Sequence, residues 1–207
     1  MASATVEMCF FCFDVLLDHL KTQESVSITP PTSILQERSR YPLFVTWDIW
    51  REQNCEYELR GCIGCLSPLS LDKIGEYAIT SSIHDKRFPS VTIDEVPKLR
   101  CSVSLLTNYE RSKRWNEWEV GKHGIIIDFK VDGHNYNATY LPHVAPEQNW
   151  SVKETVVSLI KKAGYQSHSR ISQDFLMKIE LTRYQSSKAY CTYDDYVKYR
   201  SSRSNVV

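Results

Sequence analysis

The apolar and turn patterns of this chain repeat one order of elements twice: a hairpin, a helix and a strand. In the first cycle, two β-like segments at 43–47 and 57–66 flank a polar turn at 51–54. A helix is predicted over 70–83, and alternating apolar and polar side chains predict a strand over 99–107. Strands joined by hairpins favour an antiparallel sheet with helices packed on it over a doubly wound parallel fold.

The second cycle follows the same order without obvious sequence identity. Segments 124–131 and 135–141 flank an Asp-Gly turn, the strongest short hairpin signal in the chain. A helix is predicted over 151–163, and alternation predicts a strand over 176–184. An internal duplication is the economical explanation of the two cycles.

These patterns predict an α+β fold, with a largely antiparallel sheet and flanking helices. The fold is built from two similar hairpin-helix-strand halves, at about 41–110 and 118–190. An amphipathic helix over 4–20 precedes them. We expect a single domain over 1–200, followed by a polar, frayed tail over 201–207.

The composition argues against several classes of protein. Of 207 residues, 42% are hydrophobic, which is enough for a substantial core. Basic and acidic residues number 25 each, so no net field draws the whole molecule to nucleic acid or anionic lipid. No run approaches the roughly 18 apolar residues of a membrane span, and no basic region precedes the first apolar stretch. We therefore expect an intracellular protein that does not enter the membrane, with its seven cysteines reduced.

Six motifs occur in order along the chain. They are LRGCIG at 59–64, EYAITSSIHDKRFP at 76–89, CSVSLLTNYE at 101–110, WEVGKHGI at 118–125, ATYLPHVAPEQNW at 138–150 and LTRY at 181–184. As a set they resemble the AMMECR domain family, named for a human chromosomal region associated with Alport syndrome, midface hypoplasia and elliptocytosis. The resemblance covers nearly the whole chain, from 8 to 196.

The resemblance implies one AMMECR-type α+β domain of two similar halves around an antiparallel sheet. It implies little about chemistry, because the family has no settled activity. Prokaryotic members are associated with Memo-type and radical-SAM proteins, which suggests a shared modification pathway that acts on RNA. Eukaryotic members are usually placed in the nucleus and cytoplasm.

Two Cys-x-x-Cys pairs invite a metal or redox interpretation. Cys9 and Cys12 lie within the apolar pattern of the first helix, where they read as small hydrophobic residues. Cys62 and Cys65 lie in a strand, neither on a zinc-knuckle turn nor at the helix N-terminus of a thioredoxin-like pair. Relatives also commonly lack a cysteine at position 65. We therefore expect no metal and no cofactor.

The motif LRGCIG permits a nucleophile interpretation. Side chains two apart in a strand share a face, so Arg60 and Cys62 would stand side by side. A guanidinium beside a thiol favours the thiolate. Gly61 and Gly64 would let a ligand or another backbone approach closely.

The remaining parts of such a site lie further along the chain. His123 is the candidate acid-base, with His143 as an alternative, and Glu119 is the candidate orienting carboxylate. The structural alternative is that Cys62 is a small buried residue, that Arg60 pairs with a carboxylate, and that the glycines permit a bulge or tight packing.

Two loops offer candidate binding residues. Arg87 suits bidentate recognition of a phosphate or carboxylate, whereas Asp85 is equally suited to capping or local pairing. The loop around Trp115 mixes basic and aromatic residues, a weak signature of single-stranded nucleic acid that nearby glutamates dilute.

Two functional hypotheses follow. The first is an interaction, adaptor or regulatory domain that presents the surface around LRGCIG, Arg87 and Trp115 to a protein partner; we favour it because local spacing gives no complete catalytic group. The second is an enzyme or enzyme subunit in which Cys62 acts with Arg60 and His123 in a modification reaction. The sequence does not determine the oligomeric state.

Overall fold

The computed structural model describes residues 3–22, 28–166 and 171–204. The chain divides into two compact units: unit 1 comprises Met1–Leu105 and Ser187–Val207, and unit 2 comprises Leu106–Ser186. Two long strands, β3 (Leu99–Arg111) and β6 (Glu180–Thr192), contribute residues to both units. The expected halves therefore differ in extent from the compact units.

The sheet of unit 1 is organised around β1 (Tyr41–Arg51). This strand pairs antiparallel with β2 (Glu56–Leu69) on one side and with β3 on the other, in the order β2-β1-β3-β6. Alternate side chains of β1 from Leu43 to Ile49 are buried in the core, as the period of two dictates for a half-buried strand. β2 is consequently an edge strand.

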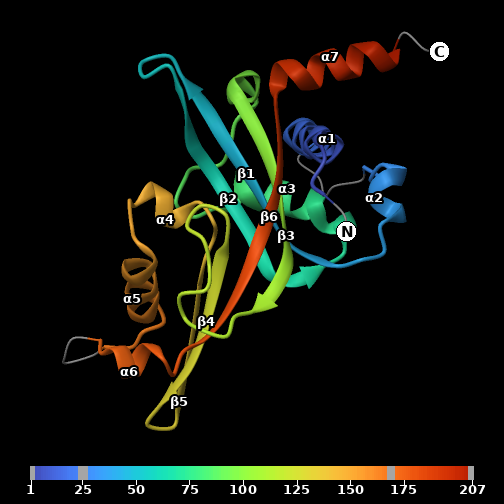
Figure 1. The fold of residues 1–207 in the computed structure, drawn as a ribbon. Coiled ribbons are helices and arrows are strands. Elements are labelled where there is room, and N and C mark those ends of the chain that lie inside the picture. Colours follow the sequence, from blue (N-terminus) through green and yellow to red (C-terminus); the bar gives the residue numbers. More distant parts are fainter. Residues whose placement is uncertain (1–2, 23–27, 167–170, 205–207) are drawn as a thin grey trace. The chain divides into compact units, whose positions relative to one another are not determined.

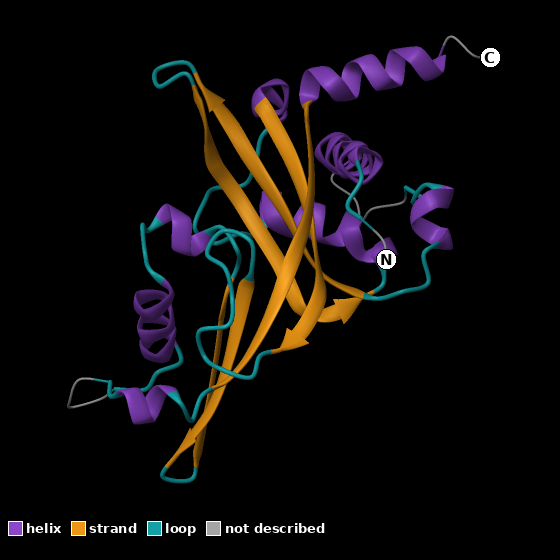
Figure 2. Cartoon of the chain, viewed as in Figure 1, coloured by secondary structure: helices purple, strands orange, loops and turns teal. Residues whose placement is uncertain are grey.

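Two helices cover the core face of this sheet, α1 (Val6–Thr22) and α3 (Ile74–Ile83) (Figures 1 and 2). The fully buried Trp47 anchors them, because its indole Nε1 donates to the backbone oxygen of Ala78 at 3.0 Å and its ring meets Phe13 edge-on. The other helical segments of unit 1 are α2 (Thr32–Gln36), the 3₁₀ helices η1 (Leu71–Lys73) and η2 (Ile93–Lys98), and α7 (Tyr193–Ser204).

Unit 2 is organised around β4 (Gly124–Val131), which pairs antiparallel with β5 (His134–Tyr140) and with β6. The Asp-Gly turn joins β4 to β5, and both of its residues have positive φ. The amphipathic helix α5 (Val152–Lys162) buries one face in this unit's own core, and Ser151 caps its N-terminus with Glu154. Two short helices complete the unit, α4 (Val144–Glu147) and α6 (Gln173–Leu176).

The predicted fold class is confirmed. Each half consists of a hairpin, a helix and a strand, and in each the first strand of the hairpin is central: β1 pairs with β2 and β3, and β4 pairs with β5 and β6. The same order of strands in both halves is what a duplication would produce.

Two expectations near the C-terminus are wrong. The strand expected from 176 begins at Glu180, because the Ser172 hydroxyl caps α6 and Leu176 belongs to that helix. Of the tail expected over 201–207, residues 201–204 are helical and belong to α7, and residues 205–207 lie outside the described part of the chain. That helix begins with a reciprocal cap between Thr192 and Asp195, a Thr-x-x-Asp signal present in the sequence.

The strand β2 contains a β-bulge at Arg60. Trp47 pairs with Gly61 but the next residue, Asp48, pairs with Leu59, so Arg60 is an extra residue without a partner on β1. Next to the bulge, a side chain on Gly61 would place its Cβ 2.0 Å from the backbone oxygen of Ser81 in α3. The glycine is therefore required for the close approach of α3 to β2.

We predict that Gly61→Ala lowers the free energy of unfolding by about 3 kcal/mol or more, since backbone must move to admit the methyl group. The matched control is Gly133→Ala in the β4–β5 turn, where nothing lies within 4 Å and only the positive φ is penalised, at about 1–2 kcal/mol. Urea denaturation of both variants measures the difference. Equal losses would show that the contact with Ser81 is not limiting.

Candidate functional site

The bulge separates the side chains of Arg60 and Cys62, which were expected to lie side by side on one face of β2. Leu59 and Cys62 pair with Asp48 and Thr46, so both lie on the face of the sheet that points away from α1 and α3. We call this the outer sheet face. Arg60, the extra residue, is displaced from the alternation, and the expectation that it shares a face with Cys62 is wrong.

Arg60 has a structural role. Its guanidinium binds the Glu95 carboxylate through two hydrogen bonds of 2.9 and 3.0 Å, and it also donates to the backbone oxygens of Pro89 and Ser90. Arg60 is 6% exposed. Burial raises the pKa of Glu95, but the bonds from Arg60 and Thr92 outweigh it, and the net pKa is lowered. This pairing fixes the loop after α3 against β2.

Asp85 and Arg87 bind the main chain of Cys62. The Asp85 carboxylate accepts the Cys62 backbone N–H at 2.9 Å, and Arg87 Nη2 donates to the Cys62 carbonyl at 2.9 Å. Arg87 also donates to Asp85 from its backbone and its guanidinium, the shortest contact being 2.6 Å. The two side chains together satisfy the groups that an edge strand leaves open. We call this arrangement the edge clamp.

The clamp keeps Asp85 ionised. Asp85 is 5% exposed, and the hydrogen bonds from Arg87, with a further one from the Cys62 amide, hold the pKa of its carboxyl well below the usual range despite burial. Arg87, by contrast, keeps more than half of its side chain exposed. Asp85 and Arg87, two of the expected binding residues, therefore bind Cys62 through hydrogen bonds to its backbone and not to its thiol.

Cys62 carries a neutral thiol. Its sulfur is half-buried and accepts a hydrogen bond from the Thr46 hydroxyl at 3.2 Å. Burial raises the pKa of the thiol, and the lowering effects of Thr46 and of the Arg87 charge do not offset it. The nearby cation is Arg87, not the expected Arg60.

The outer sheet face holds a second group that sequence reasoning missed. Arg100 on β3 pairs with Asp48 at 2.9 Å, and its guanidinium lies 4.2 Å from the ring centre of Tyr57 and 5.7 Å from that of Tyr190. Tyr190 is 61% exposed. The alternation in β1 and β3 places Asp48 and Arg100 on one face, but the register that joins them depends on strand pairing.

One polar atom on this face has no partner among the described residues. Ser102 is 1% exposed, and its hydroxyl oxygen makes no hydrogen bond. Ser102 pairs in register with Thr46, which in turn bonds Cys62. A row of two hydroxyls and a thiol thus runs across three strands, with donor capacity to spare at Ser102.

His123 and Glu119 lie in unit 2. The Glu119 carboxylate was expected to orient His123, but the two residues interact in another way. The backbone N–H of Glu119, not its carboxylate, donates to His123 Nδ1 at 3.0 Å, while the Glu119 carboxylate pairs with Lys122 at the surface. Burial and the charges of Arg183 and Lys122 lower the pKa of His123. Its imidazole is consequently neutral with the proton on Nε2, which suits a hydrogen-bond donor rather than a general base.

Two other expected positions also lie in unit 2. The prediction that Trp115 is a contact residue at the surface is wrong. Trp115 is 7% exposed and belongs to this unit's hydrophobic core, because burial of its large ring is more favourable than exposure to solvent. His143 is exposed at the start of α4.

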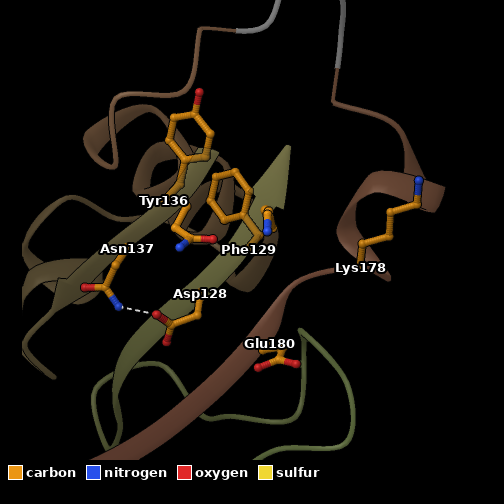
Figure 3. Close-up of a pocket in the computed structure, with 8 residues that line it drawn as sticks. Asp128, Phe129, Tyr136, Asn137, Lys178 and Glu180 are labelled. Atoms are coloured by element: carbon orange, nitrogen blue, oxygen red, sulfur yellow. Dashed lines mark hydrogen bonds between the residues drawn. The ribbon is translucent and has the colours of Figure 1, made fainter. Parts of the chain in front are cut away.

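A hollow of about 490 Å³ lies in unit 2 (Figure 3). It is lined by Asp128, Phe129, Lys130, Asn135, Tyr136, Asn137, Lys178 and Glu180. The charges of its two acidic residues and two lysines balance. Asn137 donates a hydrogen bond to Asp128, and Glu180 forms an ion pair with Arg111 at 2.6 Å. None of the residues expected from the sequence lines it.

Two kinds of site are not found in the part of the chain that the structure describes. Across these residues, no group of three or more His, Cys, Asp or Glu side chains is arranged to hold a metal ion. No described helix is both long and apolar enough to cross a membrane.

The fold and the edge clamp define an α+β domain with an antiparallel sheet, in which a charged loop closes the edge strand. A family model, AMMECR1, matches residues 9–189, and the chain belongs to the AMMECR1 family. An uncharacterized protein of Arabidopsis thaliana is 41% identical over 210 residues, spanning 100% of this chain and 94% of that protein. An uncharacterized protein of Schizosaccharomyces pombe is 35% identical, spanning 92% and 94%.

A solved structure supports the fold. The crystal structure of an uncharacterized protein from Pyrococcus horikoshii has a TM-score of 0.67 to this chain, covering 88% of this chain and 89% of that one, at 23% identity. The likeness confirms the architecture and says nothing about activity.

The edge clamp predicts a pH-dependent stability. We expect Asp85→Asn to lower the free energy of unfolding by about 1–3 kcal/mol at pH 7, since a buried, charge-assisted set of hydrogen bonds is lost. Because the folded pKa of Asp85 is depressed, its contribution is complete above the unfolded pKa of about 3.9 and declines as the pH falls below it. Denaturant unfolding at several pH values measures the gap between wild type and variant.

The control is Asp94→Asn, at an exposed aspartate of η2. It should leave stability nearly unchanged at every pH. A gap between wild type and Asp85→Asn that stays constant on acidification would mean that Asp85 is not the ionised centre of the clamp.

Proposed function

We propose that this chain is a non-catalytic interaction domain that binds a protein partner through the outer sheet face of unit 1. The observation that carries the proposal is Arg100, whose guanidinium lies near the rings of both Tyr57 and the exposed Tyr190. Arginine and tyrosine are enriched among the residues that dominate binding energy at protein interfaces. Asp48 orients the guanidinium, which lowers the entropic cost of presenting it.

The charges around this face favour a protein over a nucleic acid. On this face Arg100 is paired with Asp48; at the ends of the same strands Arg51 is paired with Glu58, and Lys98 with Glu52. A polyanion binds by neutralising its phosphates with uncompensated cations, and these pairs leave little such charge.

The alternative is an enzyme in which Cys62 acts with Arg60 and His123 on RNA or a nucleotide-like substrate. The half-buried sulfur of Cys62, close to Arg87, favours it. Three observations weigh against it: the pKa of Cys62 is raised, Arg60 is held by Glu95, and the Nδ1 of His123 is occupied by a backbone amide. We therefore place the interaction role first.

We also propose a reducing compartment, the nucleus or the cytoplasm. All seven cysteines are free, as is usual for proteins of a reducing compartment.

The proposal predicts that Tyr190→Ala reduces retention of a partner captured from cell extract by at least about tenfold, because loss of a central interface aromatic costs 2 kcal/mol or more. Met177→Ala is the matched control, since Met177 has the same 61% exposure but lies in unit 2. Quantitative mass spectrometry of the captured proteins measures retention, and circular dichroism checks that both variants are folded.

Retention of the partner by Tyr190→Ala, or equal loss with Met177→Ala, would contradict the proposed surface. Capture of a nucleic acid in place of a protein would contradict the proposed class of partner.

A further inference from the structure

The edge strand of unit 2 lacks the features that protect the edge strand of unit 1. In the described sheet β5 is bonded to β4 alone, so it is an edge strand, as β2 is. β2 carries a bulge at Arg60, a proline at Pro68 and the edge clamp. β5 keeps a regular register with β4 from His134 to Tyr140, and it contains no proline and no acidic residue, lysine or arginine. Natural proteins use such features to prevent pairing at an edge, and β5 has none of them.

The backbone of β5 directs free groups to its open side. The Thr139 carbonyl accepts a hydrogen bond from Lys162 Nζ at 2.9 Å, whereas a tyrosine hydroxyl of β6 reaches the Tyr140 carbonyl at 3.1 Å. Backbone groups alternate in direction along an antiparallel strand, so Asn135 and Asn137 point to the same side as Thr139, away from β4. In the described part of the chain, no other backbone group outside the sheet bonds these two residues.

The two halves of the chain close their edges at the same position but to different extents. Counted from the hairpin turn, Cys62 and Thr139 both belong to the sixth cross-strand pair. Each carbonyl accepts a hydrogen bond at 2.9 Å, from Arg87 and Lys162 respectively. The Cys62 amide is bound as well, by Asp85, but a lysine has only donors and binds no amide. The part of β5 nearer its turn is left open.

We propose that β5 pairs antiparallel with β5 of a second copy of this chain, with Asn135 of each copy opposite Asn137 of the other. The two-fold axis passes Tyr136, and the contact is isologous. Each Asn135–Asn137 pair exchanges both of its N–H···O bonds, because both residues direct their backbone groups outward. Lys162 disfavours the register that would bring Thr139 into the pairing, since the Thr139 carbonyl is already bound.

The charges beside the edge favour a second copy as the partner. Asn135 pairs with Lys130 and Asn137 with Asp128, while Glu180 pairs with Asp128 from β6, so these side chains share the face that holds the hollow (Figure 3). In the antiparallel pair, each row across the joined sheet runs from the lysine of one copy, through two asparagines, to the two acids of the other. Opposite charges therefore end every row, and no like charges lie directly opposite each other.

The other face adds an aromatic contact. Tyr136 stacks on Phe129 with ring centres 5.1 Å apart, and the two-fold axis brings the Tyr136 residues of both copies together. The pairing involves few residues, so it is weak and depends on protein concentration. It lies in unit 2 and uses no residue of the outer sheet face, and it therefore stands independently of the proposed function.

Sedimentation equilibrium of the full-length protein from about 10 μM to about 1 mM tests the pairing. We expect the average mass of the wild type to rise from that of one chain toward that of two. Asn135→Pro should raise the dissociation constant at least about tenfold, because it removes one outward N–H from each copy. The matched control is Asn135→Ala, which keeps the N–H and should associate like the wild type.

A second readout needs no variant. In the wild type, hydrogen exchange of the outward amides of Asn135 and Asn137, followed by NMR, should slow in step with the dimer fraction as concentration rises. The amides of Tyr136 and Ala138 already bond β4 and should be equally protected in dilute and concentrated protein.

Four results would overturn the proposal. They are a wild type that stays monomeric at every concentration, an Asn135→Pro variant that associates as tightly as the wild type, equal weakening by Asn135→Ala and Asn135→Pro, and exchange at Asn135 and Asn137 that does not change with concentration. If Asn135→Pro does not fold, the mass and the exchange of the wild type decide alone.

Discussion

The bond between the Asp85 carboxylate and the backbone N–H of Cys62 is the contact on which the LRGCIG region depends. β2 is an edge strand, and an open edge is a site for unwanted pairing with another chain. Asp85 and Arg87 bind the Cys62 amide and carbonyl and so occupy the position of a neighbouring strand. Gly61 lets α3, the helix that leads into this loop, approach closely enough for the clamp to form.

This account gives each part of LRGCIG a structural role. Arg60 leaves the alternation at a bulge and ties the loop after α3 to β2 through Glu95. Gly61 admits a backbone oxygen, and the Cys62 main chain receives the clamp. What remains for function is the outer sheet face, where Arg100, Tyr57 and Tyr190 form an oriented cluster away from the core.

Much of the fold was predictable from the sequence, because alternation and the Asp-Gly turn are local signals. Those signals, with the helical spacing of apolar residues, predicted both hairpins, the helices α1, α3 and α5, and the α+β class. Helix α7 was missed because its aromatic residues pack on α1, as Tyr196 does on Phe13, a contact that no local pattern predicts. The structural alternative allowed for a bulge in LRGCIG and for pairing of Arg60 with a carboxylate, but the position of the bulge was not predictable, because one extra residue inverts the faces of a strand without changing its composition. The same limit applies to the candidate site, where Asp85 and Arg87 were identified as candidates but their target, the Cys62 backbone, is fixed by tertiary contacts.

The central claim, that Cys62 is a neutral, structurally placed thiol, is tested most directly by its rate of alkylation with iodoacetamide as pH varies. Peptide mass spectrometry of the native protein assigns the modified site. The account predicts slow modification near neutral pH, a rise only above the ordinary thiol pKa of about 8.5, and no change with Arg60→Lys. Fast modification at neutral pH that Arg60→Lys slows would contradict this claim and would support the hypothesis that Cys62 is a nucleophile activated by Arg60.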